Sequence, residues 1–320
     1  MLGNSITYFF QSRFQKRKAF KLKIKKSKKV LCSILLCVCV FSNYNLTAFA
    51  SKTFSYEAKG FPKGKFEYTY ASLEDAVFPD AETSQALFNS MTPRECTDYL
   101  YREAVNFFVS VKIDLDWDRI LCVGDSVTLG VQTGVEEPYP NSYPEIVATL
   151  FHTDLENEGI GGSTIWGSGP YAMCKRIGNY GPADAVFILG GTNDWFYGSE
   201  CVLGDIDSPI TFKHDFNWLC ESLEELYPNA EIFIIIPMDP SEHVGAEEYD
   251  DFELIRNAER TIAENHGFHV IDLPAMHILS GLDPETKGAY YSDYVHLNTQ
   301  GYEILGKIIA YEAIKAMYAE

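Results

Sequence analysis

The apolar run Ile120-Leu-Cys-Val-Gly-Asp-Ser126 ends abruptly, and it constrains the fold more than any other stretch of the chain. A short run rich in Val, Ile and Leu, with a glycine directly after it, is typical of a buried parallel strand that leaves its sheet through a tight turn. Open α/β sheets bind ligands beyond the carboxyl ends of such strands, which would place Ser126 at a binding edge. Gly, Asp and Ser also favour ordinary turns, so this run alone does not decide between a turn and a site.

From residue 118 onward, apolar runs alternate with amphipathic stretches in a regular order. Strands are expected at 120–123, 154–158, 185–189, 232–237 and 269–273, and helices at 143–151, 212–226, 249–265 and 299–317. This alternation predicts an α/β fold, namely a three-layer α/β/α sandwich with a doubly wound (flavodoxin-like) parallel sheet.

The first fifty residues are not expected to belong to this core. Residues 1–29 contain ten Lys or Arg and no acid, 30–41 are apolar, and Ala48-Phe49-Ala50 has the small-x-small pattern of a signal peptidase site. These features predict a secretory signal peptide at 1–50, cleavage after Ala50, and a secreted, extracellular protein. The alternative is an uncleaved membrane anchor, but about twelve apolar residues fall short of the roughly twenty that span a bilayer.

Residues 51–117 carry mixed signals. A short strand is expected at 66–70, and Thr92-Pro93-Arg94-Glu95 is typical of the capped start of a helix that runs toward Val109. No repeat or linker separates this stretch from the next. We therefore interpret 51–117 as an N-terminal extension packed on a main domain at 118–320.

The charge of the mature chain excludes some partners. Removal of 1–50 takes ten of the 26 basic residues and none of the 45 acidic ones, which leaves a net charge of −29. Such a polyanion repels nucleic acid and anionic lipid surfaces, so neither nucleic-acid binding nor stable membrane association is expected. The charge suits a neutral substrate, and it also suits solubility outside the cell.

Cysteine and histidine spacings give no sign of a metal site. The five cysteines beyond the signal peptide are widely spaced and form no C-x-x-C pair, which argues against a disulfide framework and against a zinc site. No H-E-x-x-H pattern occurs either. No cofactor and no metal are expected.

Four polar segments lie at the expected element boundaries. They are Gly124-Asp125-Ser126, the stretch 157–164 that contains Gly162, Gly190-Gly-Thr-Asn193-Asp194, and Ser292-Asp293-Tyr-Val-His296. Three of them follow an expected strand and the fourth precedes the last helix. All four can therefore meet at one edge of the sheet.

Together these segments supply what acyl transfer needs. A serine hydroxyl is a poor nucleophile until a base takes its proton, and His296 can do this for Ser126 near neutral pH. Asp293, three residues before His296, is close enough to hold the other ring N–H and fix the tautomer. The backbone N–H of Gly162 and the amide of Asn193 can donate to a developing oxyanion.

These four segments resemble the blocks of the SGNH family of GDSL-type esterases and lipases. The family's Ser, Gly, Asn and His match Ser126, Gly162, Asn193 and His296, and Asp293 matches its Asp three residues before the His. The resemblance covers 118 to the C-terminus and implies a carboxylic ester hydrolase with a Ser-His-Asp triad and an acyl-enzyme. Val127 departs from the Leu of the name-giving motif, at a position that is not catalytic. An α/β-hydrolase is disfavoured because no G-x-S-x-G surrounds Ser126.

The substrate is less constrained than the reaction. Seven aromatic residues fall within or beside the segments and suggest a rim that stacks on sugar rings: Trp166, Trp195, Phe196, Tyr197, Tyr290, Tyr291 and Tyr294. Deacetylation of O-acetylated polysaccharides or of small-molecule esters is therefore a hypothesis, and the alternative for these rings is core or loop packing. A lipase or lysophospholipase, an O-acyltransferase with the same acyl-enzyme, and a non-catalytic carbohydrate-binding surface protein stay open.

Overall fold

The computed structural model describes residues 50–56, 64–139, 141–241 and 246–318, and a five-stranded parallel sheet forms its centre. The strands are β3 (Arg119–Gly124), β4 (Asp154–Gly159), β5 (Ala185–Leu189), β6 (Glu231–Ile236) and β7 (His269–Asp272). They lie in the order β4-β3-β5-β6-β7, and all neighbouring pairs are parallel. The chain thus leaves β3 toward one edge and then crosses back toward the other, which is the doubly wound topology.

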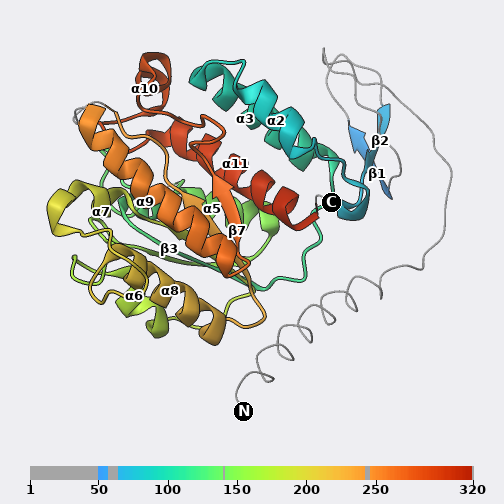
Figure 1. The fold of residues 1–320 in the computed structure, drawn as a ribbon. Helices are drawn as coiled ribbons and strands as arrows, with labels where there is room; N and C mark the ends of the chain where they lie inside the picture. The colour runs from blue at the N-terminus through green and yellow to red at the C-terminus, as the bar shows by residue number, and fades with distance from the viewer. Residues whose placement is uncertain (1–49, 57–63, 140, 242–245, 319–320) are drawn as a thin grey trace. The chain divides into compact units, whose positions relative to one another are not determined.

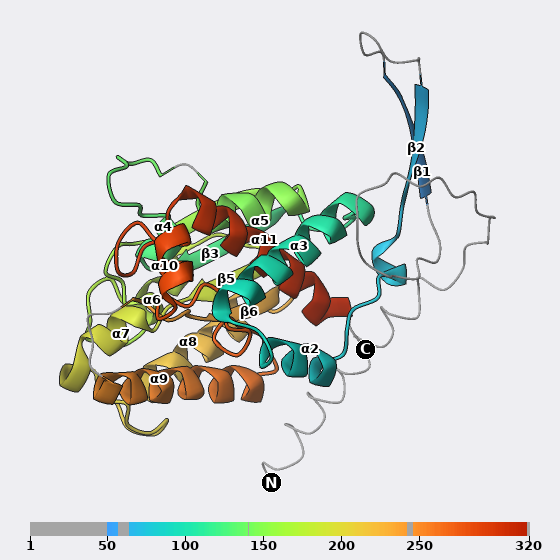
Figure 2. The same cartoon turned by 90° about the horizontal axis from the view of Figure 1, so that it is seen from above.

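Helices cover both faces of the sheet. Figures 1 and 2 show α5 (Tyr143–Phe151) and α11 (Thr299–Tyr318) on one side, with α8 (Phe212–Leu226) and α9 (Ala246–Asn265) on the other. The shorter elements are α4 (Ser126–Leu129), α6 (Met173–Arg176), η2 (Ile177–Asn179), α7 (Thr192–Phe196), η3 (Gly198–Glu200) and α10 (Pro284–Tyr290). The predicted three-layer α/β/α sandwich with a doubly wound (flavodoxin-like) sheet is confirmed.

Burial explains why these segments adopt these structures. All five residues of β5 are buried, as expected for a parallel strand with a helix layer on each face. In α8 the buried apolar residues Phe212, Phe216, Leu219 and Leu223 recur at helical spacing, so one stripe of the helix faces the core. The apolar residues that recur with helical or strand spacing in the sequence are thus the ones that contact the core.

The N-terminal part of the described chain adds a hairpin and two helices. Strands β1 (Ala50–Tyr56) and β2 (Gly64–Tyr70) pair antiparallel, and η1 (Leu73–Asp75), α2 (Ala81–Phe88) and α3 (Pro93–Ser110) follow. The hydroxyl of Thr92 accepts from Glu95 N while the Glu95 carboxylate accepts from Thr92 N, which is the predicted capping box of α3. Helix α3 packs against α11, with the rings of Phe107 and Tyr311 5.4 Å apart.

Two of the domain predictions are not tested by the fold. The predicted signal peptide lies outside the described residues, apart from Ala50, and the predicted boundary at 117–118 also stays a prediction. Among the helices of the described segments, none has the length and hydropathy to cross a membrane.

The predictions for the five strands of the parallel sheet agree with the structure to within a residue at each end, and the helices expected at 143–151 and 212–226 match it. The strand expected at 66–70 begins two residues earlier, as β2, and β1 was not predicted. Helix α9 begins three residues before its expected start at 249. Helices α2, α4, α6, α7 and α10 have no counterpart among the predicted elements. They have four to eight residues, too few for a helical period to stand out.

One glycine sets how closely α5 and α11 approach. A Cβ added at Gly306 in α11 would lie 2.7 Å from Ile146 Cβ and 3.1 Å from the carbonyl oxygen of Tyr143. Real Cβ atoms do not come this close, so the two helices would have to move apart. A Cβ at Gly288 in α10 meets nothing within 4 Å.

This contrast predicts opposite effects of the same substitution in two helices. Gly288→Ala should raise the free energy of unfolding by about 0.5–1 kcal/mol, because alanine has less backbone entropy to lose. Gly306→Ala should lower it by about 1–3 kcal/mol, because the overpacking outweighs that gain. Urea unfolding of both variants checks the pair, and a stabilised Gly306→Ala variant would contradict the close packing of α5 on α11.

Candidate active site

Ser126 lies at the carboxyl end of β3, on a turn that leaves little room. The side chain of Asp125 accepts a hydrogen bond from Val127 N at 2.8 Å and so caps α4, whose first residue is Ser126. A Cβ at Gly124 would lie 2.6 Å from the carbonyl oxygen of Leu189 in β5, so only glycine allows this approach. Since β3 is the strand from which the chain turns to both sides, Ser126 lies at the topological switch point of the sheet.

Three of the predicted residues form an unbroken chain of hydrogen bonds. The Oγ of Ser126 is 2.9 Å from Nε2 of His296, and Nδ1 of His296 is 2.8 Å from Oδ2 of Asp293. All three side chains are half-buried, so the relay is packed on one side and reaches solvent on the other. This is the arrangement in which a carboxylate orients an imidazole and the imidazole takes a proton from a hydroxyl.

The Asp293 carboxylate has four hydrogen bonds. Oδ1 accepts from the backbone N–H groups of Val295 and His296, and Oδ2 accepts from the hydroxyl of Thr133 as well as facing the His296 ring. Burial alone would raise the pKa of Asp293, but these bonds outweigh it and lower the pKa to about 2. Asp293 therefore stays ionised at neutral pH.

Thr133 is a site residue that the sequence analysis missed. Its hydroxyl donates to Asp293 at 2.7 Å, and its backbone N–H donates to Ser292 Oγ at 3.1 Å. The hydroxyl of Tyr302 in α11 donates to the carbonyl of Val131 at 2.7 Å and holds the same segment. The segment follows α4 and has no motif of its own, so no sequence signal marks Thr133.

Asn193 lies at the start of α7, directly after β5. Its Nδ2 donates to the carbonyl oxygen of Ser163 at 2.9 Å and approaches Oδ2 of Asp125 at 3.4 Å. Gly162 is the residue before Ser163, is exposed, and has a φ of 75°; a Cβ there would meet nothing within 4 Å. Asn193 thus joins the turn that carries Gly162 to the turn that carries Ser126.

Asp194, next to Asn193, holds the loop after Gly162 in place. Its two carboxylate oxygens accept from the backbone N–H groups of Ile165 and Trp166 at 3.0 and 2.7 Å. Asp215 in α8 accepts from Gly167 N at 2.7 Å and continues this support along the loop. The roles of Asp194 and Asp215 were not predicted, because their hydrogen bonds to the backbone of the loop join residues far apart in the sequence and follow no recognisable spacing.

Two carboxyls beneath the site are fully buried. Burial raises the pKa of Asp125 to about 6, although Val127 N–H and His296 act against it. Burial raises the pKa of Asp194 to about 6 as well, despite its two backbone donors. The pKa of Asp293 is lowered while those of Asp125 and Asp194 are raised, because Asp293 has more hydrogen-bond donors and lies nearer to solvent.

The predicted aromatic rim is wrong for four of its seven members. Trp166, Trp195, Tyr290 and Tyr291 are buried, whereas Phe196, Tyr197 and Tyr294 are 43%, 38% and 48% exposed. Trp195 stacks on Phe252 at 4.6 Å, which is core packing rather than a binding surface. The rings of Phe196 and Tyr294 meet at 6.4 Å, and Tyr294 is two residues before His296. The exposed aromatic surface beside the site is therefore these three residues.

The five cysteines of the described residues are free and buried. Burial raises the pKa of Cys96 to about 11 and that of Cys174 to about 12, so both stay as thiols at neutral pH. Within the described segments, no group of three or more His, Cys, Asp or Glu residues is arranged to hold a metal ion.

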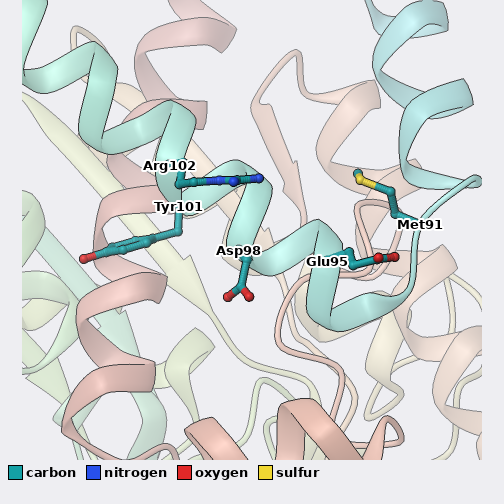
Figure 3. Close-up of a pocket in the computed structure, with 5 residues that line it drawn as sticks. All are labelled: Met91, Glu95, Asp98, Tyr101 and Arg102. Atoms are coloured by element: carbon teal, nitrogen blue, oxygen red, sulfur yellow. The ribbon is translucent and has the colours of Figure 1, made fainter. Parts of the chain in front are cut away.

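A surface hollow lies along α3, away from these residues. It has a volume of about 480 Å³ and is lined by Met91, Glu95, Asp98, Tyr101 and Arg102, of which all but Met91 belong to α3 (Figure 3). It contains no hydroxyl paired with a histidine and none of the predicted site residues. The hydrogen-bonded Ser126, His296 and Asp293 therefore lie at the edge of the sheet and not at this hollow.

Comparison with known proteins shows the family of this chain. Residues 122–304 match the model of the GDSL-like lipase/acylhydrolase family, which is more than half of the chain. This chain belongs to that family. Membership makes the protein a hydrolase, and it confirms the resemblance on which the site residues were matched. No curated protein matches the chain.

The first two of three similar solved structures support the same fold. One crystal structure is 24% identical with a TM-score of 0.54, and covers 61% of this chain and 94% of the other. A protein from Lactobacillus plantarum is 21% identical with a TM-score of 0.52, at 61% and 96% coverage. An acetyl xylan esterase is 20% identical with a TM-score of 0.45, at 60% and 97% coverage.

The buried carboxyls of the GDSL-like hydrolase predict how its stability depends on pH. An unfolded chain releases the Asp194 proton near 3.8, the ordinary pKa of an aspartic acid, whereas the folded chain holds it to a pKa of about 6. The folded state therefore binds more protons between these values, and the free energy of unfolding should fall as pH rises from 4 to 6, by at most about 1.4 kcal/mol per pH unit for each such group.

Asp194→Asn removes one titrating carboxyl from the folded state, so the decline between pH 4 and pH 6 should be shallower in this variant than in the wild type. Its stability should also be lower throughout, because both oxygens of Asp194 accept a backbone N–H and the NH₂ group of asparagine cannot accept either of them. Urea unfolding at pH 4, 5 and 6 measures both effects. An equal slope in the two proteins would mean that Asp194 is charged in the folded state.

Proposed function

We propose that this hydrolase is a secreted serine esterase that hydrolyses short-chain carboxylic esters, with acetyl esters of carbohydrates as the favoured substrates. The observation that carries the proposal is the relay Ser126–His296–Asp293, with distances of 2.9 and 2.8 Å. Those distances allow proton transfer from the hydroxyl to the ring without rearrangement. Secretion rests on the predicted signal peptide at 1–50.

In the first step, Oγ of Ser126 attacks the carbonyl carbon of the ester while Nε2 of His296 accepts the hydroxyl proton. The tetrahedral intermediate then collapses, and the imidazolium returns that proton to the alcohol oxygen as the C–O bond of the ester breaks. This leaves an acyl group on Ser126. Water attacks the acyl-enzyme with His296 again as base, the imidazolium then returns the proton to Oγ of Ser126 as the acyl C–O bond breaks, and the acid is released. The ionised Asp293 holds the ring and stabilises its charged form.

The oxyanion of each intermediate needs donors that are already in place. We assign this role to the backbone N–H groups of Ser126 and Gly162 and to Nδ2 of Asn193. The 2.9 Å bond to Ser163 fixes the Asn193 amide, while among the described residues its second N–H has the long contact to Asp125 at 3.4 Å. The oxyanion of a bound substrate is a stronger acceptor than Oδ2 of Asp125 at that distance, and it can accept a hydrogen bond from this second N–H.

A small apolar cavity beside the triad supports a short acyl group. Its volume is about 10 Å³, room for about one water-sized or methyl-sized group. Its lining residues are Val127, Leu189, Thr192, Pro237, Met238, Pro240 and Val295. Three of these are chain neighbours of Ser126, Asn193 and His296. An acetyl methyl suits this space, whereas a longer chain would have to displace side chains.

A neutral sugar is the alcohol part that the surface favours. Phe196, Tyr197 and Tyr294 are exposed beside the site, and aromatic faces stack on the apolar faces of sugar rings. The acidic composition of the chain, with 45 Asp or Glu against 26 Lys or Arg, disfavours anionic lipids.

The first test is the replacement of the nucleophile. Ser126→Ala should lower kcat on p-nitrophenyl acetate by a factor of at least about 10³ while leaving the circular dichroism spectrum unchanged, because the hydroxyl forms the acyl-enzyme. Acetate release from acetylated xylan by the wild type, assayed in parallel, tests the carbohydrate substrate. Ser126-dependent transfer to an added alcohol without net hydrolysis would indicate an acyltransferase instead. Sugar binding without turnover would indicate a non-catalytic protein.

The second test is the length of the acyl chain. Wild-type kcat/KM should fall from p-nitrophenyl acetate to butyrate to decanoate, and Met238→Ala should raise the butyrate-to-acetate ratio roughly tenfold by making room for two more methylenes. Met276→Ala is the control, since Met276 is buried but does not line the cavity. Wild-type activity that rises with chain length would contradict the acetyl preference and would favour a lipase.

A further inference from the structure

We infer that helix α3, which precedes the family match at 122–304, positions the catalytic loop at 291–297 that carries Asp293 and His296. The inference rests on the proposed function, because it assigns these two residues a catalytic role. It assigns a structural role to part of the N-terminal segment, which the family pattern does not cover.

The catalytic loop is closed at its base. Tyr291 and Leu297 form an antiparallel bridge, and Ser292 N donates to the carbonyl of His296 at 2.8 Å. Directly outside the bridge, Asn298 N donates to the carbonyl of Tyr290 at 2.8 Å. The loop is thus tied to the end of α10, and a displacement of Tyr290 or Tyr291 moves the loop with it.

The first tether from α3 reaches Tyr290. The Tyr290 hydroxyl donates to Oδ1 of Asp98 at 2.6 Å, and Nε of Arg94 donates to Oδ2 of the same carboxylate at 2.9 Å. The Arg94 guanidinium also lies 4.5 Å from the centroid of the Tyr290 ring. Tyr290 is 2% exposed, so the ring is fixed by packing and its hydroxyl by a charged acceptor.

The second tether reaches Tyr291 through one intermediate residue. Leu279 N donates to the hydroxyl oxygen of Thr97 at 2.9 Å in a buried contact, and Leu279 O accepts from the Tyr291 hydroxyl at 2.5 Å. Leu279 has a φ of 49°, which is unfavourable for a leucine and persists only where its surroundings hold it. Thr97 and Tyr291 hold it from both sides.

Two consecutive residues of α3 therefore control two consecutive residues at the base of the catalytic loop. Asp98 holds Tyr290, and Thr97 holds Tyr291 by way of Leu279. Catalysis by a relay of hydrogen bonds is sensitive to displacements of less than about 1 Å, so loss of a tether should slow the chemical step more than it weakens binding. Thr97, Asp98 and Tyr290 are positioning residues, since none of them touches the triad in the described contacts.

The experiment compares Tyr290→Phe, Asp98→Ala and their combination in the full-length protein. Each single variant should lower kcat on p-nitrophenyl acetate about tenfold and leave KM within about twofold. The double variant should be no slower than the slower single variant, because both changes break the same contact. The proton on Nδ1 of His296 should give a low-field NMR signal in the wild type that broadens or shifts in both variants.

Tyr101→Phe is the matched control. Tyr101 also lies on α3 and loses only a hydroxyl, but that hydroxyl contacts Glu303 and Lys307 of α11 rather than the catalytic loop. In Figure 3, Asp98 and Tyr101 project from the helix in different directions. This variant should keep the wild-type kcat and the wild-type NMR signal, even if it lowers the melting temperature.

Two failures are distinguishable. Wild-type protein without Ser126-dependent turnover would overturn the proposed function, while the NMR signal still tests whether α3 holds the loop. Turnover and NMR signal in Tyr290→Phe and Asp98→Ala that equal those of the wild type would overturn the inference alone. Equal losses in Tyr101→Phe would also overturn it, because the effect would then come from general loosening of α3.

Discussion

One buried arginine holds the edge of the sheet on which the site is built. Arg176, 8% exposed, donates to the carbonyl oxygens of Gly124 at the end of β3 and Glu158 in β4, at 2.8 and 2.7 Å. It also reaches Ser163 Oγ at 3.2 Å. The Gly124 carbonyl also accepts from Ile160 N at 3.1 Å, so Arg176 adds a second, charged donor to it. One guanidinium thus ties the ends of β3 and β4 to Ser163 and fixes the distance between the Ser126 and Gly162 turns.

Two kinds of carboxyl then serve two purposes at this edge. Asp293 accepts from several donors near solvent and stays charged, which suits a group that orients His296. Asp125 and Asp194 are fully buried, with raised pKa values, and bind backbone N–H groups of the turns that carry the site. The same residue type thus orients a base in one place and shapes the backbone in others, and the difference arises from burial and the number of donors.

The sequence predicted what depends on periodicity and chain order. Residues 185–189 were predicted as a strand because a short apolar run between helical patterns fits a sheet that is covered on both faces. Ser126, Asn193 and His296 were found because each lies next to the boundary of a predicted strand or helix. Thr133 and Arg176 were not found, because their contacts join segments distant in sequence and follow no spacing. The aromatic rim was overestimated for the same reason, since exposure of a ring such as Trp195 depends on what packs over it.

The contacts of α3 matter because the catalytic loop has few contacts of its own to fix its position. The loop at 291–297 forms one isolated bridge, and a single bridge is too small to fix two side chains to a fraction of an ångström. The sheet supplies rigidity to Ser126, which follows β3 directly, but His296 lies beyond the last strand and before α11. Its position must come from packing against other helices. Helix α3 lies against α11 and reaches α10, so the N-terminal segment supplies on the His296 side the rigid support that the sheet supplies on the Ser126 side.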